Sequence, residues 1–231
     1  MSAFYAYPIS CAFGRVVSKA KLFGAAKASH ALKEKFAQQV SQIRWAYKLY
    51  PEGLNLAAST AVPEIQIFTI ALKTPDIDLV VLSHIDKAIS YPIIFEISYE
   101  GRVKVMAAYK RPPETARGNW VCSDYFETDW HESDSGLENL RAQLPVALSL
   151  ESLYGQLIRA LMPYAAREGE TLQMHAERIM AIKSQAKKCL RLETKVSKEK
   201  QFNRRLEINQ ELNEANYRLD CLKINDSSYK E

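Results

Sequence analysis

The chain has 231 residues, of which 47% are hydrophobic and 25% charged, and its formal net charge is +4. This composition is ordinary for a globular protein and too apolar for an intrinsically disordered one. No apolar run approaches the ~20 residues that span a bilayer. The N-terminal segment lacks the basic flank and apolar stretch of a secretory signal. A cytoplasmic protein without a membrane anchor is therefore expected.

The charged side chains are unevenly distributed. Residues 1–50 carry eight basic side chains and one acidic one, residues 51–165 carry nine and fifteen, and residues 166–231 carry fourteen and eleven. Basic ends around an acidic middle are typical of contact with a polyanion or an acidic partner, and equally of a solvated surface. The four cysteines and four histidines stand singly, without ligand spacing, so neither a metal, a cofactor nor a disulfide is predicted.

Hydrophobic periodicity over residues 1–165 predicts an α+β domain with a mixed sheet and a few packing helices. The first thirty residues lack a clear period and are interpreted as an irregular, partly buried arm. Ser29 and the Asp76–Asp78 segment are expected to begin helices. The predicted elements are a helix over 31–40, strands over 43–50 and 65–72, a helix over 77–89, a hairpin of strands over 93–99 and 103–109 with its turn at Glu100-Gly101, a strand over 120–128, a short strand over 144–148 and a helix over 149–162.

The predicted core of this sheet comes from the strands over 65–72, 93–99 and 103–109. The first of them is apolar on both sides, which is typical of a strand in the middle of a sheet. The expected core residues are Ile67, Phe68, Ile93, Phe95 and Val105.

Hydrophobic periodicity over residues 166–224 predicts a helical tail, which is either a coiled coil in one long helix or a helical hairpin. Residues 225–231 are expected to be disordered. A first apolar seam is expected through Leu172, Ala176, Ile179, Ala186 and Leu190, with Lys183 on the same line. A second seam, with steps of four and three, runs through Ile208, Leu212, Ala215, Leu219 and Leu222. Such a polar helix needs a partner. We therefore interpret Ile208, Leu212, Leu219 and Leu222 as protein-binding residues, including possible self-association.

The tail also contains the clearest pattern of charged side chains in the sequence. Residues 183–205 contain nine basic side chains against Glu193 and Glu199. A row at intervals of four can follow a nucleic-acid backbone, or can simply flank a coiled coil. The predicted DNA-binding residues are Lys183, Lys187, Arg191, Lys195, Arg204 and Arg205.

Two acidic patterns are candidates for a catalytic site. The segment with Asp124, Glu127, Asp129, His131 and Glu132 contains possible metal ligands, but it lacks a known spacing and fits a strand that runs into a solvated loop. Pro75-Asp76 matches half of a nuclease motif, yet the second half, an acid and a lysine two residues apart on one strand, is missing. No catalytic residue is predicted, and a metal-dependent nuclease remains an alternative.

Several blocks in order resemble a bacterial family labelled only as a domain of unknown function. They are FGRVVSKAKLF, IRWAYKLYPEGLNL, VPEIQIFTIALK, YPIIFEISYEGRVKVMAAYKRP, YFETDW and EKQFNRRLEINQELN. Members of that family are similar in being encoded beside DNA methyltransferases and superfamily 2 helicases in restriction-like or phage-defence islands. The resemblance implies a non-catalytic accessory subunit that binds a helicase or methyltransferase, and DNA as a further candidate. A purely structural coiled-coil interaction protein is the other alternative.

Overall fold

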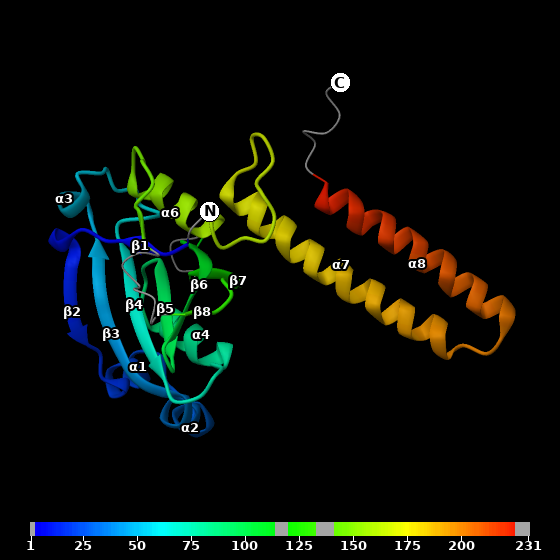
Figure 1. Ribbon diagram of the computed structural model, residues 1–231, viewed down its shortest axis with the longest axis horizontal. Helices are drawn as coiled ribbons and strands as arrows, with labels where there is room; N and C mark the ends of the chain where they lie inside the picture. The colour runs from blue at the N-terminus through cyan, green and yellow to red at the C-terminus, as the bar shows by residue number, and fades with distance from the viewer. Residues whose placement is uncertain (1–2, 114–119, 133–140, 225–231) are drawn as a thin grey trace. The chain divides into compact units, whose positions relative to one another are not determined.

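The computed structural model describes residues 3–113, 120–132 and 141–224, which form two compact units, Met1–Leu161 and Met162–Glu231. The two units are shown in Figure 1 and are described separately below. The expected domain boundary at residue 165 falls inside the second unit, and the predicted disordered end, 225–231, lies outside the described residues.

The first unit is built on one mixed sheet of seven strands. Six strands lie in chain order: β2 (Ala12–Val16), β3 (Val40–Leu49), β4 (Ile65–Leu72), β5 (Ile93–Tyr99), β6 (Arg102–Arg111) and β7 (Val121–Glu127), while β8 (His131–Glu132) also pairs with β6. β4 and β5 are parallel, and the other neighbours are antiparallel. The predicted α+β class with a mixed sheet is therefore confirmed.

Short elements complete the N-terminal side of this unit. β1 (Tyr5–Ala6) pairs in parallel with β9 (Ala142–Gln143), and the 3-10 helix η1 (Ile9–Cys11) follows β1. Helix α3 (Pro51–Leu54) turns the chain after β3, with Asn55 in the left-handed conformation at its end. The predicted arm thus contains β1, η1 and β2, as well as a first helix.

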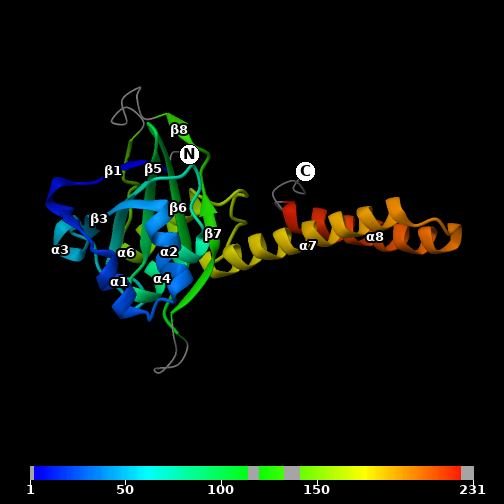
Figure 2. The same cartoon turned by 90° about the horizontal axis from the view of Figure 1, so that it is seen from below.

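Three helices cover one face of the sheet: α1 (Lys19–Ala25), α2 (His30–Gln39) and α4 (Leu79–Ala88), the last of which connects the parallel strands (Figure 2). Phe36 and Ile85 from these helices pack with Phe68 and Phe95 from β4 and β5, and all four are at most 1% exposed. All five predicted core residues are buried to the same degree. Helix α6 (Leu150–Arg159) packs on β6, where the buried Tyr154 hydroxyl accepts from Lys110 N at 2.8 Å.

The capping predictions are confirmed, and one strand prediction is wrong. The Ser29 side chain accepts from Leu32 N, and that of Asp78 accepts from Val80 N. Residues 144–148 are not a strand; β9 ends at Gln143, before Pro145, which has no N–H to donate to a ladder.

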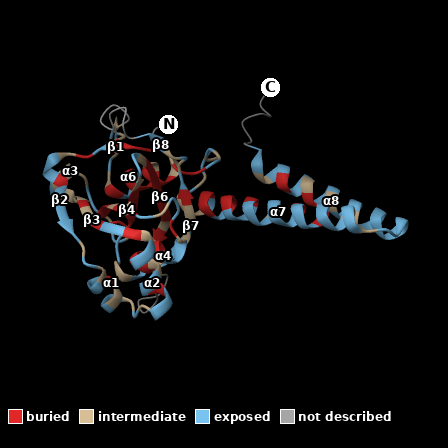
Figure 3. Cartoon of the chain, turned by 60° about the horizontal axis from the view of Figure 1, so that its bottom comes forward, coloured by how far each residue is buried: buried red, intermediate tan, exposed pale blue. Residues whose placement is uncertain are grey.

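The second unit is a hairpin of two helices, α7 (Leu172–Lys198) and α8 (Phe202–Lys223). Thr171 caps α7 by accepting from Met174 N, and residues 199–201 make the turn. Gln185 Nε2 donates to Ala215 O at 2.9 Å, and Lys188 contacts Glu211 at 3.4 Å, so the helices run antiparallel. Figure 3 shows most of the surface of both helices exposed; the buried residues of α7 include Ile182 and Leu192, and those of α8 are Ala215 and Leu219.

The predicted seam of α7 is partly wrong in phase. Ile179 is buried as predicted, but Ala186 and Leu190 are exposed, and Leu190 keeps 64% of its surface. The buried line of α7 instead continues through Ile182, Gln185, Cys189, Leu192 and Val196, of which Gln185 and Val196 are half-buried. In α8 the predicted seam is confirmed as the less exposed side, with Ala215 and Leu219 buried. Within the described residues, none of the helices is long and apolar enough to cross a membrane.

Candidate nucleic-acid interface

The predicted basic row lies on the outer surface of α7. Its four members, Lys183, Lys187, Arg191 and Lys195, are all exposed, and none of them belongs to the buried line of the helix. Residues four apart lie nearly above one another, so the row is about 18 Å long at 1.5 Å rise per residue. Within residues 3–113, 120–132 and 141–224, Lys187, Arg191 and Lys195 form no salt bridge. These three cations are therefore available to an anion in solution.

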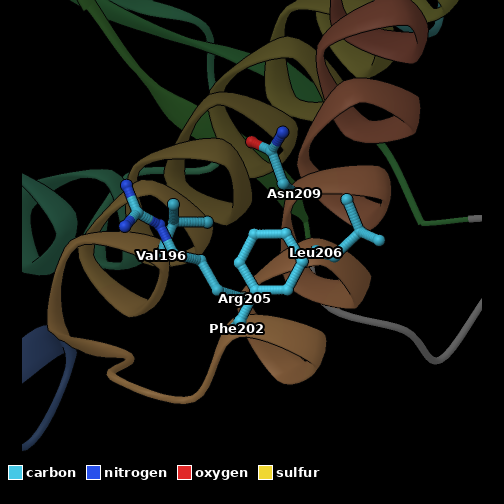
Figure 4. Close-up of a pocket in the computed structure, with 5 residues that line it drawn as sticks. All are labelled: Val196, Phe202, Arg205, Leu206 and Asn209. Atoms are coloured by element: carbon cyan, nitrogen blue, oxygen red, sulfur yellow. The ribbon is translucent and has the colours of Figure 1, made fainter.

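Arg204 and Arg205 lie apart from that row, in the first turn of α8. Both are exposed, and the Arg204 Nε lies 3.6 Å from a Glu199 carboxylate oxygen. Arg205 belongs instead to a small pocket of about 200 Å³ at the tip of the hairpin, together with Val196, Phe202, Leu206 and Asn209 (Figure 4). The structure thus separates the six predicted DNA-binding residues into a row of four and a pair at the tip.

The tip pocket is bordered by unusually exposed apolar side chains. Phe202 is 77% exposed and Leu206 is 52% exposed. Val196 comes from the last turns of α7, and the other lining residues come from the first turns of α8 (Figure 4). Burying such side chains is favourable, so a solvated phenylalanine beside a pocket is a candidate contact point for another protein.

The predicted protein-binding residues lie on a different surface. Ile208, Leu212 and Leu222 are half-buried and Leu219 is buried, on the side of α8 that packs against α7. Within the hairpin, these side chains of α8 already pack against α7. Their use by another chain stays a prediction.

The acidic residues that are candidate metal ligands by sequence are dispersed. Glu127 lies 2.6 Å from Lys104 Nζ, and the ring of His131 packs edge-on against Phe4. In the described part of the chain, no three His, Cys, Asp or Glu side chains are grouped as metal ligands. The hairpin of β5 and β6 offers Glu96 and Lys104 as the acid and the lysine of a nuclease motif, but on different strands. They also lie on opposite faces of the sheet, because Glu96 pairs with Val105 and Lys104 pairs with Ile97.

A family model described as a domain of unknown function (DUF4391) matches residues 6–219. The chain belongs to this family. The match includes the whole sheet as well as α7 and most of α8, so the helical hairpin is part of the DUF4391 domain. No match was found among curated proteins or among solved structures.

The DUF4391 chain also contains a buried polar cluster that the sequence patterns do not indicate. Lys110 is 1% exposed, and its Nζ donates to Asp86 O at 2.5 Å and to Ile89 O, the carbonyls at the end of α4. It also lies 3.5 Å from the Asp86 carboxylate, which accepts from the Tyr125 hydroxyl. Burial is the main cause that lowers the pKa of Lys110 and raises the pKa of Asp86.

This cluster stabilises the fold rather than forming an open site. Lys110 closes the C-terminal end of α4, where backbone carbonyls lack helical partners. The neighbouring Cys122 has its pKa raised to about 11, chiefly by burial of the thiol, although part of its surface reaches solvent. A thiol with a raised pKa is a poor nucleophile at neutral pH. No local sequence motif connects the three residues of the cluster, because Lys110 lies 24 residues after Asp86 and Tyr125 lies 15 residues after Lys110.

Proposed function

We propose that this chain is a non-catalytic accessory subunit that binds the DNA backbone through the exposed basic row of its hairpin. The observation that carries the proposal is the exposure of Lys187, Arg191 and Lys195 in one line, without intramolecular salt bridges in the described chain. An array of fixed cations releases counterions from the phosphates it neutralises, and it reads no base edges. Binding that is insensitive to base sequence and sensitive to salt is therefore expected.

The experiment compares the full chain with the variant Lys187→Gln/Arg191→Gln/Lys195→Gln on two duplexes of unrelated sequence. Glutamine keeps helix propensity, so the hairpin stays folded while three charges are lost. Fluorescence anisotropy over a salt series should show weaker binding and a log–log slope shallower by about 2–3, at roughly 0.9 per phosphate contact.

The matched control is Lys27→Gln/Lys33→Gln/Lys87→Gln, which removes three exposed cations from the first unit. It changes the net charge equally and leaves the row intact. Equal loss in both variants would show that only overall charge attracts DNA. If the row variant binds like the parent, or if neither binds, the row serves only to solubilise the hairpin, as in the structural coiled-coil alternative.

We further propose that the partner is a DNA methyltransferase or helicase of a restriction-like or anti-phage system, as the family resemblance implies, and that it contacts the hairpin tip. The support for this surface is the exposure of Phe202 and Leu206 around the tip pocket. The tagged chain, purified from its native host, should retain the methyltransferase or helicase. Phe202→Ser/Leu206→Ser should lose it, whereas Leu190→Ser, a comparably exposed leucine outside the tip, should not. Retention by all three would place the contact elsewhere.

A further inference from the structure

A second, larger pocket lies within the first unit, on the face of the sheet that carries the helices. Its volume is about 570 Å³, and it is lined by residues of β2, β3 and β4, of α1, and of the end of α4 and the segment after it. Pockets of about 300–1,000 Å³ are the usual size for small-molecule ligands. The residues given above as its lining include none from α7 or α8.

The interior of this pocket combines aromatic rings with one buried amide. Phe13 lies 4.2 Å from Trp45 between ring centroids, and Trp45 lies nearly parallel to Phe68, with an interplanar angle of 11°. Gln66 also lines the pocket and is only 2% exposed. The three rings therefore stack into one aromatic surface, and an aromatic surface beside a fixed polar group is suited to a planar, heteroaromatic ligand.

The orientation of that amide follows from its neighbours. Gln66 Nε2 donates to Glu64 Oε1 at 2.6 Å, and the other Glu64 oxygen lies 2.5 Å from Lys48 Nζ. A carboxylate only accepts hydrogen bonds, so the Gln66 NH₂ group must face Glu64. The carbonyl oxygen of Gln66 is then the atom that the amide offers to a ligand, and it accepts from an amino or imino N–H.

The mouth of the pocket is positively charged. Arg15 and Lys21 line it and are exposed, and among the described residues that line the pocket none is acidic. The Arg15 guanidinium lies 4.6 Å above the centre of the Phe13 ring, which restrains it beside the aromatic wall. Guanidinium and ammonium groups at this position favour a ligand with a phosphate at one end.

We propose that this pocket binds a nucleotide, with the base against the aromatic stack of Phe13, Trp45 and Phe68, an N–H of the base donating to Gln66, and the phosphate at Arg15 and Lys21. All of the common bases carry such an N–H, so the pocket distinguishes nucleotides from other phosphates rather than one base from another. The ligand is either a free nucleotide or the terminal nucleotide of a single strand. The site lies in the first unit, and it is independent of DNA binding by the hairpin.

The test is calorimetric titration of the full chain with the four nucleoside 5′-monophosphates, with adenosine, with inorganic phosphate and with 5′-phosphorylated oligo(dA). At least one monophosphate should bind about tenfold or more tightly than either adenosine or phosphate, because each of these lacks one half of the ligand. The oligonucleotide is compared with its monomer in the Lys187→Gln/Arg191→Gln/Lys195→Gln chain, so that binding by the hairpin row does not contribute. Tighter binding of the oligonucleotide would then identify a strand end as the source, and the reverse order would identify a free nucleotide.

Variants then assign the two halves of the site. Arg15→Gln/Lys21→Gln should weaken monophosphate binding about tenfold or more and leave adenosine unchanged, while Gln66→Met should weaken adenosine and monophosphate alike. Lys33→Gln, an exposed cation on α2, is the matched control and should bind like the parent. No binding of any probe at millimolar concentration, or equal binding by parent and pocket variants with unchanged circular dichroism, would overturn the proposal. Either result leaves the salt-dependence test of the hairpin unaffected.

Discussion

Charged side chains in the interior of the first unit connect segments that are far apart in sequence. Lys110 spans from β6 to the end of α4 and is enclosed by Asp86 and two carbonyl oxygens. A second pair, Glu96 and Arg141, forms two hydrogen bonds of 2.9 and 2.7 Å, and Arg141 also donates to Tyr5 O at 2.6 Å. Each group connects segments that are distant in sequence, so removing one partner affects more than one element.

Replacing Lys110 by methionine tests the helix-closing role. The variant Lys110→Met leaves Asp86 as a buried charge without its cation, and we expect a loss of about 3–5 kcal/mol in the free energy of unfolding. Lys73→Met is the control, because Lys73 Nζ also donates to a helix carbonyl, Ala37 O, but on the exposed surface. It should cost less than about 1 kcal/mol. Similar losses in urea denaturation of both variants would contradict the importance of burial.

Glu170 gives the second unit a pH dependence. Hydrogen bonds from Arg178 are the largest cause that lowers its pKa from 4.5 to about 2, and a bond from Arg167 N adds to it. The carboxylate is favoured by the folded state, so its contribution is complete above pH 4.5 and is lost as the pH falls toward 2. The difference in unfolding free energy between the parent and Glu170→Gln should shrink over this interval.

The exposed neighbour Glu168 provides the control for this measurement. Glu168→Gln should track the parent at every pH in denaturation followed by helical circular dichroism. A difference between parent and Glu170→Gln that stays constant from pH 6 to pH 2 would mean that the Arg178 pair contributes nothing to linkage.

At the scale of elements, the phase of α7 decides which residues are core and which are surface. Leu192 is 3% exposed and Leu190 is 64% exposed, although both are leucines of one helix. Leu192→Ala should lower the unfolding free energy of the hairpin by about 2–4 kcal/mol, because it leaves a cavity between α7 and α8. Leu190→Ala should change it by less than about 0.5 kcal/mol. Circular dichroism at 222 nm during denaturation measures both, and the opposite order would restore the seam predicted from sequence.

The error in that seam has a physical origin. Gln185 and Cys189 occupy the buried line of α7, whereas the more apolar Leu190 faces solvent, so hydrophobicity points to the wrong side. The polar Gln185 is tolerated on this buried line because its amide donates a hydrogen bond to Ala215 O in α8, a contact that periodicity cannot reveal. In α8 the apolar residues recur regularly at the interface, and periodicity is sufficient to find them.

The strands show the same contrast. β4, β5 and β6 are largely buried and are predictable nearly to their ends, because apolar segments bounded by turns are unambiguous. β2 escapes prediction, since it is an edge strand with four of five residues exposed and a positive φ of 66° at Gly14. The pocket lined by Phe13, Trp45 and Gln66 cannot be predicted from the sequence either, because these residues come together only when β2 pairs with β3.

At the scale of the whole molecule, each of the two units has buried residues of its own. Phe95, fully buried, belongs to the cluster of β4, β5, α2 and α4, and the hairpin has its own line of buried residues. The three tryptophans, Trp45, Trp120 and Trp130, all lie in the first unit. Tryptophan fluorescence therefore reports unfolding of that unit alone, while circular dichroism at 222 nm also follows the long helices α7 and α8 of the second.

This difference in probes permits a test of whether the two units unfold independently. Phe95→Ala should cost about 3–5 kcal/mol and lower the fluorescence midpoint, since a large aromatic side chain is removed from a closed core. Leu192→Ala should leave that midpoint in place and lower the dichroism midpoint. If either substitution moves both midpoints by the same amount, the chain unfolds as one cooperative body. Separate transitions would instead mean that the hairpin can change its partners without unfolding the sheet, as an accessory subunit that binds through its tail requires.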